Sequence, residues 1–385
     1  MIRRAVSQAP PPTAARGTAA LLLWALVAAG CGASPPAVPV TEVDDYHARL
    51  VQEGLGIPWG MAFIAPRRLL VSDRAGTLRL IDLERGTVVE IAGVPRVAAF
   101  GQGGLLDVAL APDFAATGRL YFSYAKPHRR GAVLALSRAR LAENRLVEWE
   151  ELFVSNHASR DPRHFGGRLA FDGEGHLYLT HGDRGDRGAA QDLGDHAGKV
   201  LRLALDGSVP PDNPFLGVAG ARPEIWSLGH RNPQGIAFDP ATGRLWLVEH
   251  GPRGGDELNL VERGGNYGWP GVSYGMEYHA PIPVGEGTER PGMVSPRHWW
   301  IPSIAPSSLL VYRGARHPEL AGALLVGALA GRHLAELRLD GGGRVVAERR
   351  HLGELGERIR SLAVDGEGGI WLGADSGRLY RLERR

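Results

Sequence analysis

Short apolar segments recur along the chain, and each is followed by a turn and a second apolar segment. The turns contain Asp, Pro or Gly, and the second segment carries leucine or an aromatic residue. Apolar runs of this length, separated by turn residues, are typical of β-hairpins. The five predicted hairpins pair Gly60–Phe63 with Leu69–Ser72, Val108–Leu110 with Leu120–Ser123, Leu169–Phe171 with Leu177–Thr180, Ile236–Phe238 with Leu245–Val248, and Leu362–Val364 with Ile370–Leu372.

The spacing of these hairpins is that of a radial repeat. Successive copies begin about 40 residues or more apart, as propeller blades with insertions do. Between the fourth and fifth copies, Ala321–Gly327 followed by Glu336–Asp340 supplies a sixth blade. Helical periodicity is nowhere sustained, which argues against a helical repeat array. We therefore predict an all-β, six-bladed β-propeller with four-stranded antiparallel blades, and a pair of β-sandwiches is the alternative.

The composition agrees with a fold of many short strands. The 385 residues include 54 glycines and 27 prolines, and 44% of the residues are hydrophobic. This length suits one large domain or two small ones. The chain shows neither a nucleotide-binding loop between a strand and a helix, nor a zinc-type His/Cys cluster, nor a Gly-x-Ser-x-Gly elbow, which argues against those enzyme classes.

The N-terminus has the pattern of an export signal. Three arginines precede the apolar run Ala19–Val27, which is short for a membrane span, and the single cysteine, Cys31, follows Val27–Gly30. The segment Val27–Gly30 before Cys31 resembles a bacterial lipoprotein cleavage box, although Ala28 stands where leucine is usual. We predict a signal peptide at 1–30, a lipid-anchor tether at 31–45 and the propeller at 46–385, in the periplasm or cell envelope. An ordinary secretory signal with an incidental cysteine is the alternative.

Charge gives no support for nucleic-acid binding. The full chain has a formal charge of +2, and removal of residues 1–30 leaves 41 basic residues against 42 acidic ones. Strongly basic patches are the usual mark of nucleic-acid binders. With one cysteine, the chain forms no internal disulfide.

Two polar loops stand next to predicted hairpins and offer acid–base groups. Gln102 lies in the glycine-rich stretch Phe100–Asp107, where the backbone can approach a ligand closely. His164 precedes the third hairpin, and Asp183 follows the same hairpin. The pKa of an unperturbed histidine suits a general base near neutrality. Turn chemistry for Gln102 and a structural role for His164 are the alternatives.

Further loops offer cations, amides and carbonyls. Arg231 and Asn232 provide a guanidinium and an amide suited to a carboxylate, quinone or sugar oxygen, or else to a turn-stabilising network. The loop His250–Glu257 presents backbone carbonyls and two acids, which are ligands of a hard cation such as calcium. Arg358 and Arg360 are alternate residues of an extended segment and so point the same way, toward an anionic ligand or toward solvent.

The order of these motifs resembles a known family, the soluble aldose sugar dehydrogenases that use pyrroloquinoline quinone (PQQ), to which soluble quinoprotein glucose dehydrogenase also belongs. The resemblance covers about Gly54–Leu382 and implies a six-bladed propeller with PQQ and calcium in the channel mouth. The matching segments, in chain order, are Gly101–Leu106, His164–Leu169, Gly198–Leu203, Asp212–Phe215, Gly229–Gly235, Glu249–Pro252, Gly265–Pro270 and Ala305–Ser308.

The resemblance also implies roles for individual residues. His164 matches the general base that takes the proton of the anomeric hydroxyl, with Gln102 and Asp183 as its neighbours. Calcium acts as a Lewis acid on the quinone in such a site. The implied ligands of the cofactor and metals are Arg231 and Asn232 for the quinone oxygens, Ser303 for the cofactor, Arg358 and Arg360 for its carboxylates, the carbonyls of Gly251 and Pro252 for the catalytic calcium, and Glu257 and Tyr267 for a second calcium.

Two positions depart from the family pattern. Ala330 stands where the family has a lysine or arginine that contacts PQQ, with Arg332 two residues further on. Loss of a charge-assisted contact weakens binding by about 1.5–3 kcal/mol. His250 replaces a glutamine beside the calcium loop.

The sequence thus predicts oxidation of aldose sugars at the anomeric carbon to lactones, with electrons passed to an external acceptor. The predicted partners are the sugar, the acceptor and, through the lipid anchor alone, a membrane. The alternatives are a cofactor-free propeller that binds ligands at the cell surface, supported by Ala330, and a lactone hydrolase, which the arginines at the site disfavour.

Overall fold

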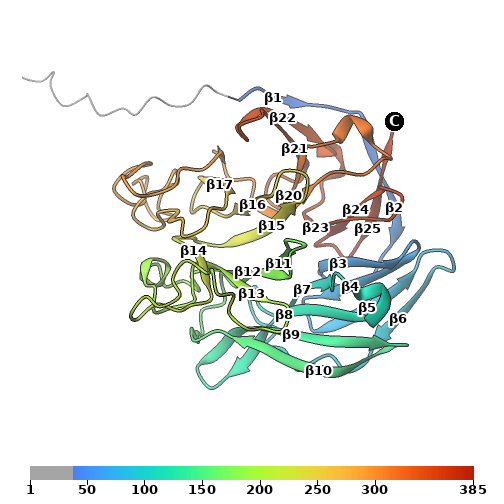
Figure 1. The fold of residues 1–385 in the computed structure, drawn as a ribbon. Helices are drawn as coiled ribbons and strands as arrows, with labels where there is room; N and C mark the ends of the chain where they lie inside the picture. The colour runs from blue at the N-terminus through green and yellow to red at the C-terminus, as the bar shows by residue number, and fades with distance from the viewer. Residues whose placement is uncertain (1–37) are drawn as a thin grey trace, which may run out of the picture. The chain divides into compact units, whose positions relative to one another are not determined.

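The computed structural model describes residues 38–385, and these contain six β-sheets arranged around a common centre (Figure 1). Each sheet is one propeller blade, and in the first four blades the strands are antiparallel and follow one another outward in chain order. The first three blades are blade 1, β3 (Pro58–Ala65), β4 (Arg68–Asp73), β5 (Thr77–Asp82) and β6 (Thr87–Ile91); blade 2, β7 (Leu105–Leu110), β8 (Arg119–His128), β9 (Gly131–Ala142) and β10 (Arg145–Val154); and blade 3, β11 (Gly166–Phe171), β12 (His176–His181), β13 (Lys199–Ala204) and β14 (Ile225–Leu228).

The remaining blades include two strands from the start of the described chain. β2 (Tyr46–Gln52) is the outer strand of blade 6 and pairs with the C-terminal strand, so the two ends of the chain close the ring. The other strands are blade 4, β15 (Pro233–Asp239), β16 (Arg244–Glu249), β17 (Asp256–Leu260) and β18 (His298–Trp300); blade 5, β19 (Pro306–Val311), β20 (Leu324–Ala328), β21 (Leu334–Leu339), β22 (Val345–His351) and the parallel β1 (Val40–Glu42); and blade 6, β23 (Ile359–Val364), β24 (Ile370–Ala374) and β25 (Leu379–Arg384).

The prediction of a six-bladed propeller is confirmed. The five predicted hairpins coincide with the first and second strands of blades 1, 2, 3, 4 and 6. The sixth blade is present, but its first strand is β19, and Ala321–Ala323 belongs instead to the turn after the short helix η2 (Pro318–Leu320). The apolar pattern of β19 is interrupted by Ser307 and Ser308, both buried, which is why the sequence did not reveal it.

The N-terminal predictions lie mostly outside the described residues. This applies to the signal peptide at 1–30 and to Cys31. Within the predicted tether at 31–45, residues Val40–Glu42 form β1 and pair with β22, and the compact unit of the propeller begins at Pro39. No helix in residues 38–385 is long and apolar enough to cross a membrane.

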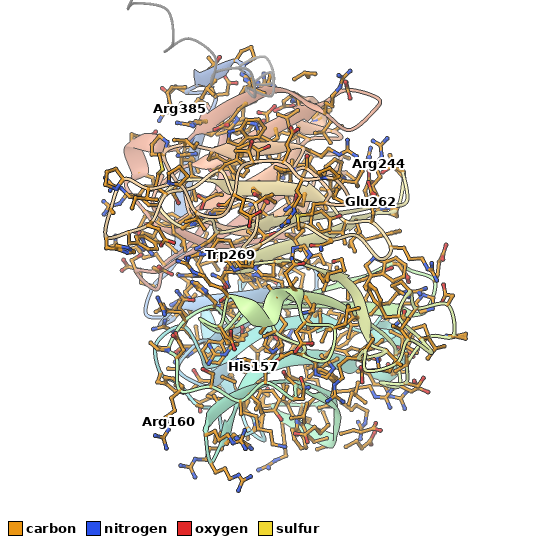
Figure 2. The ribbon with its side chains drawn as sticks, turned by 90° about the vertical axis from the view of Figure 1, so that its left-hand side faces the viewer. His157, Arg160, Arg244, Glu262, Trp269 and Arg385 are labelled. Atoms are coloured by element: carbon orange, nitrogen blue, oxygen red, sulfur yellow. The ribbon has the colours of Figure 1, made fainter. Side chains whose placement is uncertain are left out.

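The first strands of adjacent blades contact one another in a closed ring, β3 beside β7 and so on to β23 beside β3. Apolar side chains fill the space between the sheets (Figure 2). At every interface one side chain also donates a hydrogen bond to a carbonyl of the next blade's first strand. The donors and acceptors are Ser72 to Leu106, Ser123 to Gly167, Thr180 to Pro233, His250 to Pro306, Ser307 to Ile359 and Ser361 to Pro58.

Arg168 closes the centre of the ring. Its buried guanidinium, from β11, bonds to the first strand of each of the other five blades, and burial lowers its pKa to about 10. Such a group stays charged only where its donors are all accepted. The acceptors are the carbonyls of Trp59 at 2.7 Å, Gln234 at 2.8 Å, Ser307 at 2.7 Å and Arg360 at 3.0 Å, with the carboxylate of Asp107 at 3.4 Å.

Candidate active site

Two sets of loops meet at one end of the propeller. In an antiparallel blade, the first strand begins at the end where the second strand finishes. The loops that enter first strands and the loops that leave second strands therefore lie around the same mouth. The predicted site residues fall into these sets: Gln102, His164, Arg231, Asn232, Ser303 and Arg358 precede first strands, Asp183, Gly251 and Pro252 follow second strands, and Arg360 lies on β23.

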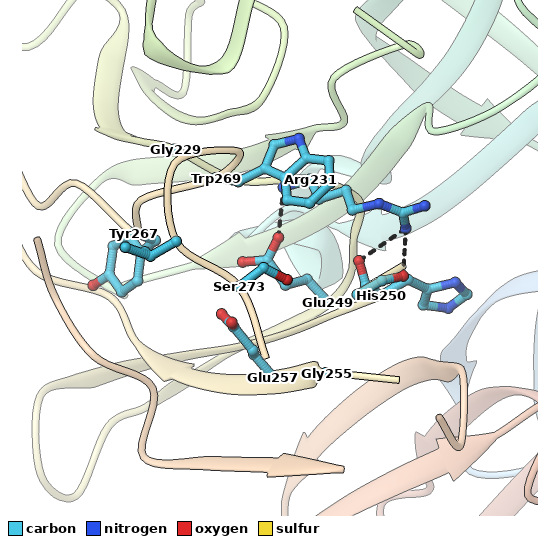
Figure 3. Close-up of a pocket in the computed structure, with 11 residues that line it drawn as sticks. Gly229, Arg231, Glu249, His250, Gly255, Glu257, Tyr267, Trp269 and Ser273 are labelled. Atoms are coloured by element: carbon cyan, nitrogen blue, oxygen red, sulfur yellow. Dashed lines mark hydrogen bonds between the residues drawn. The ribbon is translucent and has the colours of Figure 1, made fainter. Parts of the chain in front are cut away.

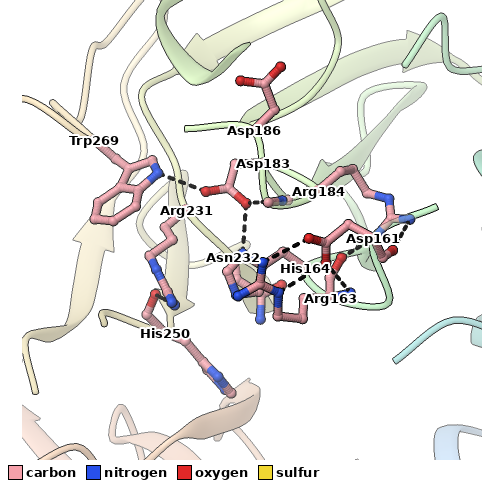
Figure 4. Close-up of polar contacts among 12 residues, drawn as sticks. Asp161, Arg163, His164, Asp183, Arg184, Asp186, Arg231, Asn232, His250 and Trp269 are labelled. Atoms are coloured by element: carbon pink, nitrogen blue, oxygen red, sulfur yellow. Dashed lines mark hydrogen bonds and ion pairs between the residues drawn. The ribbon is translucent and has the colours of Figure 1, made fainter. Parts of the chain in front are cut away.

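His164 and Asp183 form a buried pair at this mouth (Figure 4). The imidazole Nδ1 lies 2.6 Å from Asp183 Oδ1, and the indole of Trp269 donates to Asp183 Oδ2 at 2.8 Å. Gln102 accepts the backbone N–H of His164 at 2.7 Å, which holds His164 at a left-handed φ of 54°. The carboxylate keeps the proton on Nδ1, so Nε2 is free to accept one.

Burial favours the neutral imidazole. It lowers the pKa of His164 below 6.5, the charge of Arg231 lowers it further, and the hydrogen bond to Asp183 offsets only part of the effect. Burial raises the pKa of Asp183, but its hydrogen bond and charge interaction with His164, the backbone N–H of Gly185 and the charge of Arg231 together outweigh burial and leave the pKa below its usual value. The pair is therefore a neutral histidine oriented by a carboxylate, which is the arrangement of a general base.

Arg231 lies across the mouth from this pair. Its guanidinium donates to the carbonyl of Gly251 at 2.6 Å and to that of His250 at 3.1 Å, and lies 5.3 Å from the ring centre of Trp269. Trp269 thus touches both halves of the site. In Figure 2 it lies near the middle of the face toward the viewer, between the two halves of the chain.

Asn232 holds an unused hydrogen-bond donor. Its Oδ1 accepts from Gln234 at 3.1 Å, whereas its Nδ2 is buried without a partner among the described residues. Leaving a buried donor unpaired costs about 1–3 kcal/mol. Such a group points to a ligand that supplies the missing acceptor.

Arg358 and Arg360 lie side by side, as the alternation predicted. Asp375 accepts from Arg358 at 2.9 Å and from Arg360 at 2.8 and 3.1 Å. Burial raises the pKa of Asp375, but the two guanidiniums outweigh burial and keep that pKa low. One carboxylate faces two arginines, so the pair keeps an excess positive charge.

Ser303 is at the mouth, but its hydroxyl already donates to Asp256 at 2.6 Å, so it offers a ligand only lone pairs. Asp256 also accepts the backbone N–H groups of Gly251 at 2.9 Å and Ala305 at 2.8 Å. This carboxylate therefore fastens Gly251 to the segment that contains Ser303 and Ala305.

The residues proposed for calcium are of two kinds. In the loop Gly251–Pro252, the carbonyl of Gly251 lies beside Arg231 and already accepts from that arginine. Residues 38–385 contain no cluster of three or more His, Cys, Asp or Glu side chains that could hold a metal. Calcium at this loop would therefore depend on carbonyls, each of which keeps a second lone pair.

Glu257 and Tyr267 line one pocket with Glu249 (Figure 3). Burial, together with the charge of Glu249, raises the pKa of Glu257 to about 8, so this carboxyl is held mainly in its neutral form near neutral pH. The Tyr267 hydroxyl donates to Leu260 at 2.5 Å, which leaves only its backbone carbonyl for a metal.

Ala330 is exposed at the mouth and lines a cavity with Ser303. Arg332 is exposed as well, at a left-handed φ of 54°.

Reasoning from the sequence missed Trp269 and Asp375 as site residues. Trp269 lies within the motif Gly265–Pro270, and Asp375 directly follows a second strand, which are the signals that could have found them.

The fold and this site define a propeller oxidoreductase of the sugar dehydrogenase class. The family model for glucose/sorbosone dehydrogenase matches residues 55–381. The chain belongs to the glucose/sorbosone dehydrogenase family.

Relatives and solved structures agree with this assignment. Aldose sugar dehydrogenase YliI of Escherichia coli is 38% identical over 346 residues, which cover 88% of this chain and 93% of the relative. The crystal structure of soluble aldose sugar dehydrogenase from Escherichia coli in the apo form superposes with a TM-score of 0.85, at 37% identity, over 88% of this chain and all of that one (100%). The PQQ-bound aldose sugar dehydrogenase of Streptomyces coelicolor gives a TM-score of 0.73, at 30% identity, over 91% and 100% of the two chains.

Proposed function

We propose that this protein is a PQQ- and calcium-dependent dehydrogenase that oxidises aldose sugars at the anomeric carbon to lactones. The observation that carries the proposal is the neutral, carboxylate-oriented His164 in a mouth that also gathers Arg231, Arg358 and Arg360. The similarity to the PQQ-bound form of the Streptomyces coelicolor aldose sugar dehydrogenase supports the cofactor.

The residues fit an anionic quinone. The unpaired Nδ2 of Asn232 and the guanidinium of Arg231 would donate to its oxygens, while Arg358 and Arg360 would hold its carboxylates. PQQ, when bound, supplies the two-electron oxidant that accepts hydride from the sugar C1. Calcium on the carbonyls of Gly251 and Pro252 would withdraw charge from the quinone.

The protein's own contribution is the proton. His164 Nε2 takes the proton of the anomeric hydroxyl as the C1–H bond breaks and the C1=O bond of the lactone forms. Asp183 stabilises the resulting imidazolium, and Trp269 keeps the second carboxylate oxygen in place. Gln102 fixes the backbone of His164, and its amide nitrogen is available to a sugar hydroxyl.

We further propose that Glu257 and the carbonyl of Tyr267 hold a second calcium, and that the reduced cofactor is reoxidised by an external acceptor. Export with lipidation at Cys31 places the enzyme in the periplasm or cell envelope.

Reconstitution tests the function. Purified residues 39–385 are titrated with PQQ in calcium buffer, and dye reduction is followed with glucose, galactose or maltose. Binding of PQQ with sugar-dependent dye reduction is the expected result. Absence of both would contradict the dehydrogenase and favour the cofactor-free binding module, for which Ala330 is the supporting observation.

A further inference from the structure

The loops that leave second strands place one residue from several blades at the mouth. These loops supply Asp183 from blade 3, Gly251 from blade 4, Ala330 from blade 5 and Asp375 from blade 6, each one or two residues past the strand end. The corresponding residue of blade 1 is Arg74, directly after β4 (Arg68–Asp73). Blade 2 differs, since β8 and β9 extend to a hairpin turn at His128–Gly131. Arg74 is thus a charged residue at an active-site position to which the proposed function gives no role.

The backbone of Arg74 is fixed between blades 1 and 2. Its N–H donates to Ile57 at 3.1 Å, and its carbonyl accepts from Leu105 at 3.2 Å. Gly104 packs on it so closely that an added Cβ would lie 1.8 Å from the Arg74 carbonyl oxygen. The position of Arg74 is therefore set by two neighbouring strands and does not depend on a loose loop.

The side chain of Arg74 is only partly used. Nη1 donates to the carbonyl of Gly101 at 2.6 Å, next to Gln102, and the side chain is half-buried. Guanidinium carries five N–H donors in a planar fork that suits carboxylates. Further donors remain for a ligand.

Arg74 belongs to the same electrostatic cluster as the arginines of blade 6. Burial lowers its pKa, the charge of Arg360 lowers it further, and Asp375 opposes both. Asp375 already accepts from Arg358 and Arg360. The nearby Asp73 also raises the pKa of Arg74, but its carboxylate already pairs with Arg79 at 3.1 Å. Arg74, Arg358 and Arg360 therefore outnumber the remaining carboxylate, Asp375, and the excess positive charge favours an anion that neutralises it.

We propose that Arg74 binds a carboxylate of PQQ and supplies the positive charge that Ala330 does not. The inference rests on the proposed function. Ala330 comes from the loop after the second strand of blade 5, Arg74 from the same loop of blade 1, and the blade 6 arginines lie between them in the ring. Arg74, two blades away from position 330, would therefore contact the same anionic PQQ from the opposite side.

The test measures the dissociation constant of PQQ in calcium buffer by absorbance titration of residues 39–385. Arg74→Gln removes the charge but keeps a donor for the Gly101 carbonyl, whereas Arg74→Lys keeps the charge. Arg85→Ala is the matched control, because Arg85 is an exposed arginine of the same blade at the opposite end of its strands. Far-UV circular dichroism and the Tm of each apo variant check folding.

We expect Arg74→Gln to weaken PQQ binding about 10-fold or more, with little change for Arg74→Lys and none for Arg85→Ala. Ala330→Lys in the Arg74→Gln background recovers most of the lost affinity. The inference is wrong if Arg74→Gln binds PQQ as tightly as the wild type. It is also wrong if Arg74→Gln and Arg74→Lys bind PQQ equally weakly and Ala330→Lys restores no affinity, because Arg74 then only positions the Gln102 loop. If the wild-type protein binds PQQ but the variants do not show the expected affinities, only the inference about Arg74 is overturned. If the wild-type protein does not bind PQQ, the proposed function is overturned as well.

Discussion

Asp183 accepts hydrogen bonds from His164 and Trp269, one on each carboxylate oxygen, at 2.6 and 2.8 Å. This arrangement leaves the carboxylate no freedom to rotate, so the imidazole of His164 has one orientation and one tautomer. The orientation of the general base, His164, is therefore fixed by three loops: its own, the loop of blade 3 that carries Asp183, and the loop of blade 4 that carries Trp269.

The first prediction concerns this pair. Asp183→Asn replaces the acceptor of the His164 proton with an amide, which can donate to Nδ1 and select the wrong tautomer. We expect the reductive half-reaction, measured by stopped-flow absorbance of bound PQQ, to slow about 100-fold or more while PQQ still binds. His164→Ala should behave in the same way. A half-reaction at the wild-type rate in either variant would remove the pair from proton transfer.

The second prediction concerns pH. Because burial and Arg231 lower the pKa of His164 below 6.5, the neutral base persists when solvent-exposed histidines are already protonated. The rate of the reductive half-reaction should stay constant from mildly alkaline pH down to 6.5 and fall only below it. Asp183→Asn removes the group that raises this pKa, so the acid limb should move to still lower pH. An acid limb above 6.5 would contradict the neutral, buried base.

The third prediction uses the unpaired amide of Asn232. Asn232→Asp keeps an oxygen that can accept from Gln234 but replaces the free donor with an acceptor. Loss of that donor should weaken PQQ binding about 10-fold or more, measured by titration of the apo protein. Asn156→Asp serves as the control, because Asn156 is part of an exposed network of blade 3. Equal affinity in wild type and Asn232→Asp would show that the donor faces no ligand.

The fourth prediction concerns stability. Arg168→Met leaves the carbonyls of four blades and the carboxylate of Asp107 without their shared donor. Breaking a buried charged network by removing one partner costs about 3–5 kcal/mol. Urea unfolding should show a loss of this size in the free energy of unfolding. Arg344→Met, at an exposed ion pair with Asp340, should change it by less than about 0.5 kcal/mol.

Much of the fold was readable from the sequence because each blade repeats a local signal. A first strand, a turn and a second strand lie within a short stretch of chain, so five of the six hairpins could be predicted. The strand β19 escaped because it has two buried serines near its start in place of apolar residues, and the hydroxyl of Ser307 serves to bond to carbonyls of the neighbouring strands β20 and β23. The closing strand β2 escaped because its partner, β25, lies at the other end of the chain.

Much of the site was also readable, but as separate motifs. The sequence by itself determined that His164 and Arg231 stand in loops next to strand ends and that Arg358 and Arg360 are alternate residues of an extended segment. Only the tertiary structure decided that Asp183 orients His164, that Asp375 joins the two arginines, that Arg168 binds all the other blades and that Arg74 faces the same cluster. The physical reason is that hairpin pairing depends on neighbouring residues, whereas closing the ring brings together loops from all parts of the chain.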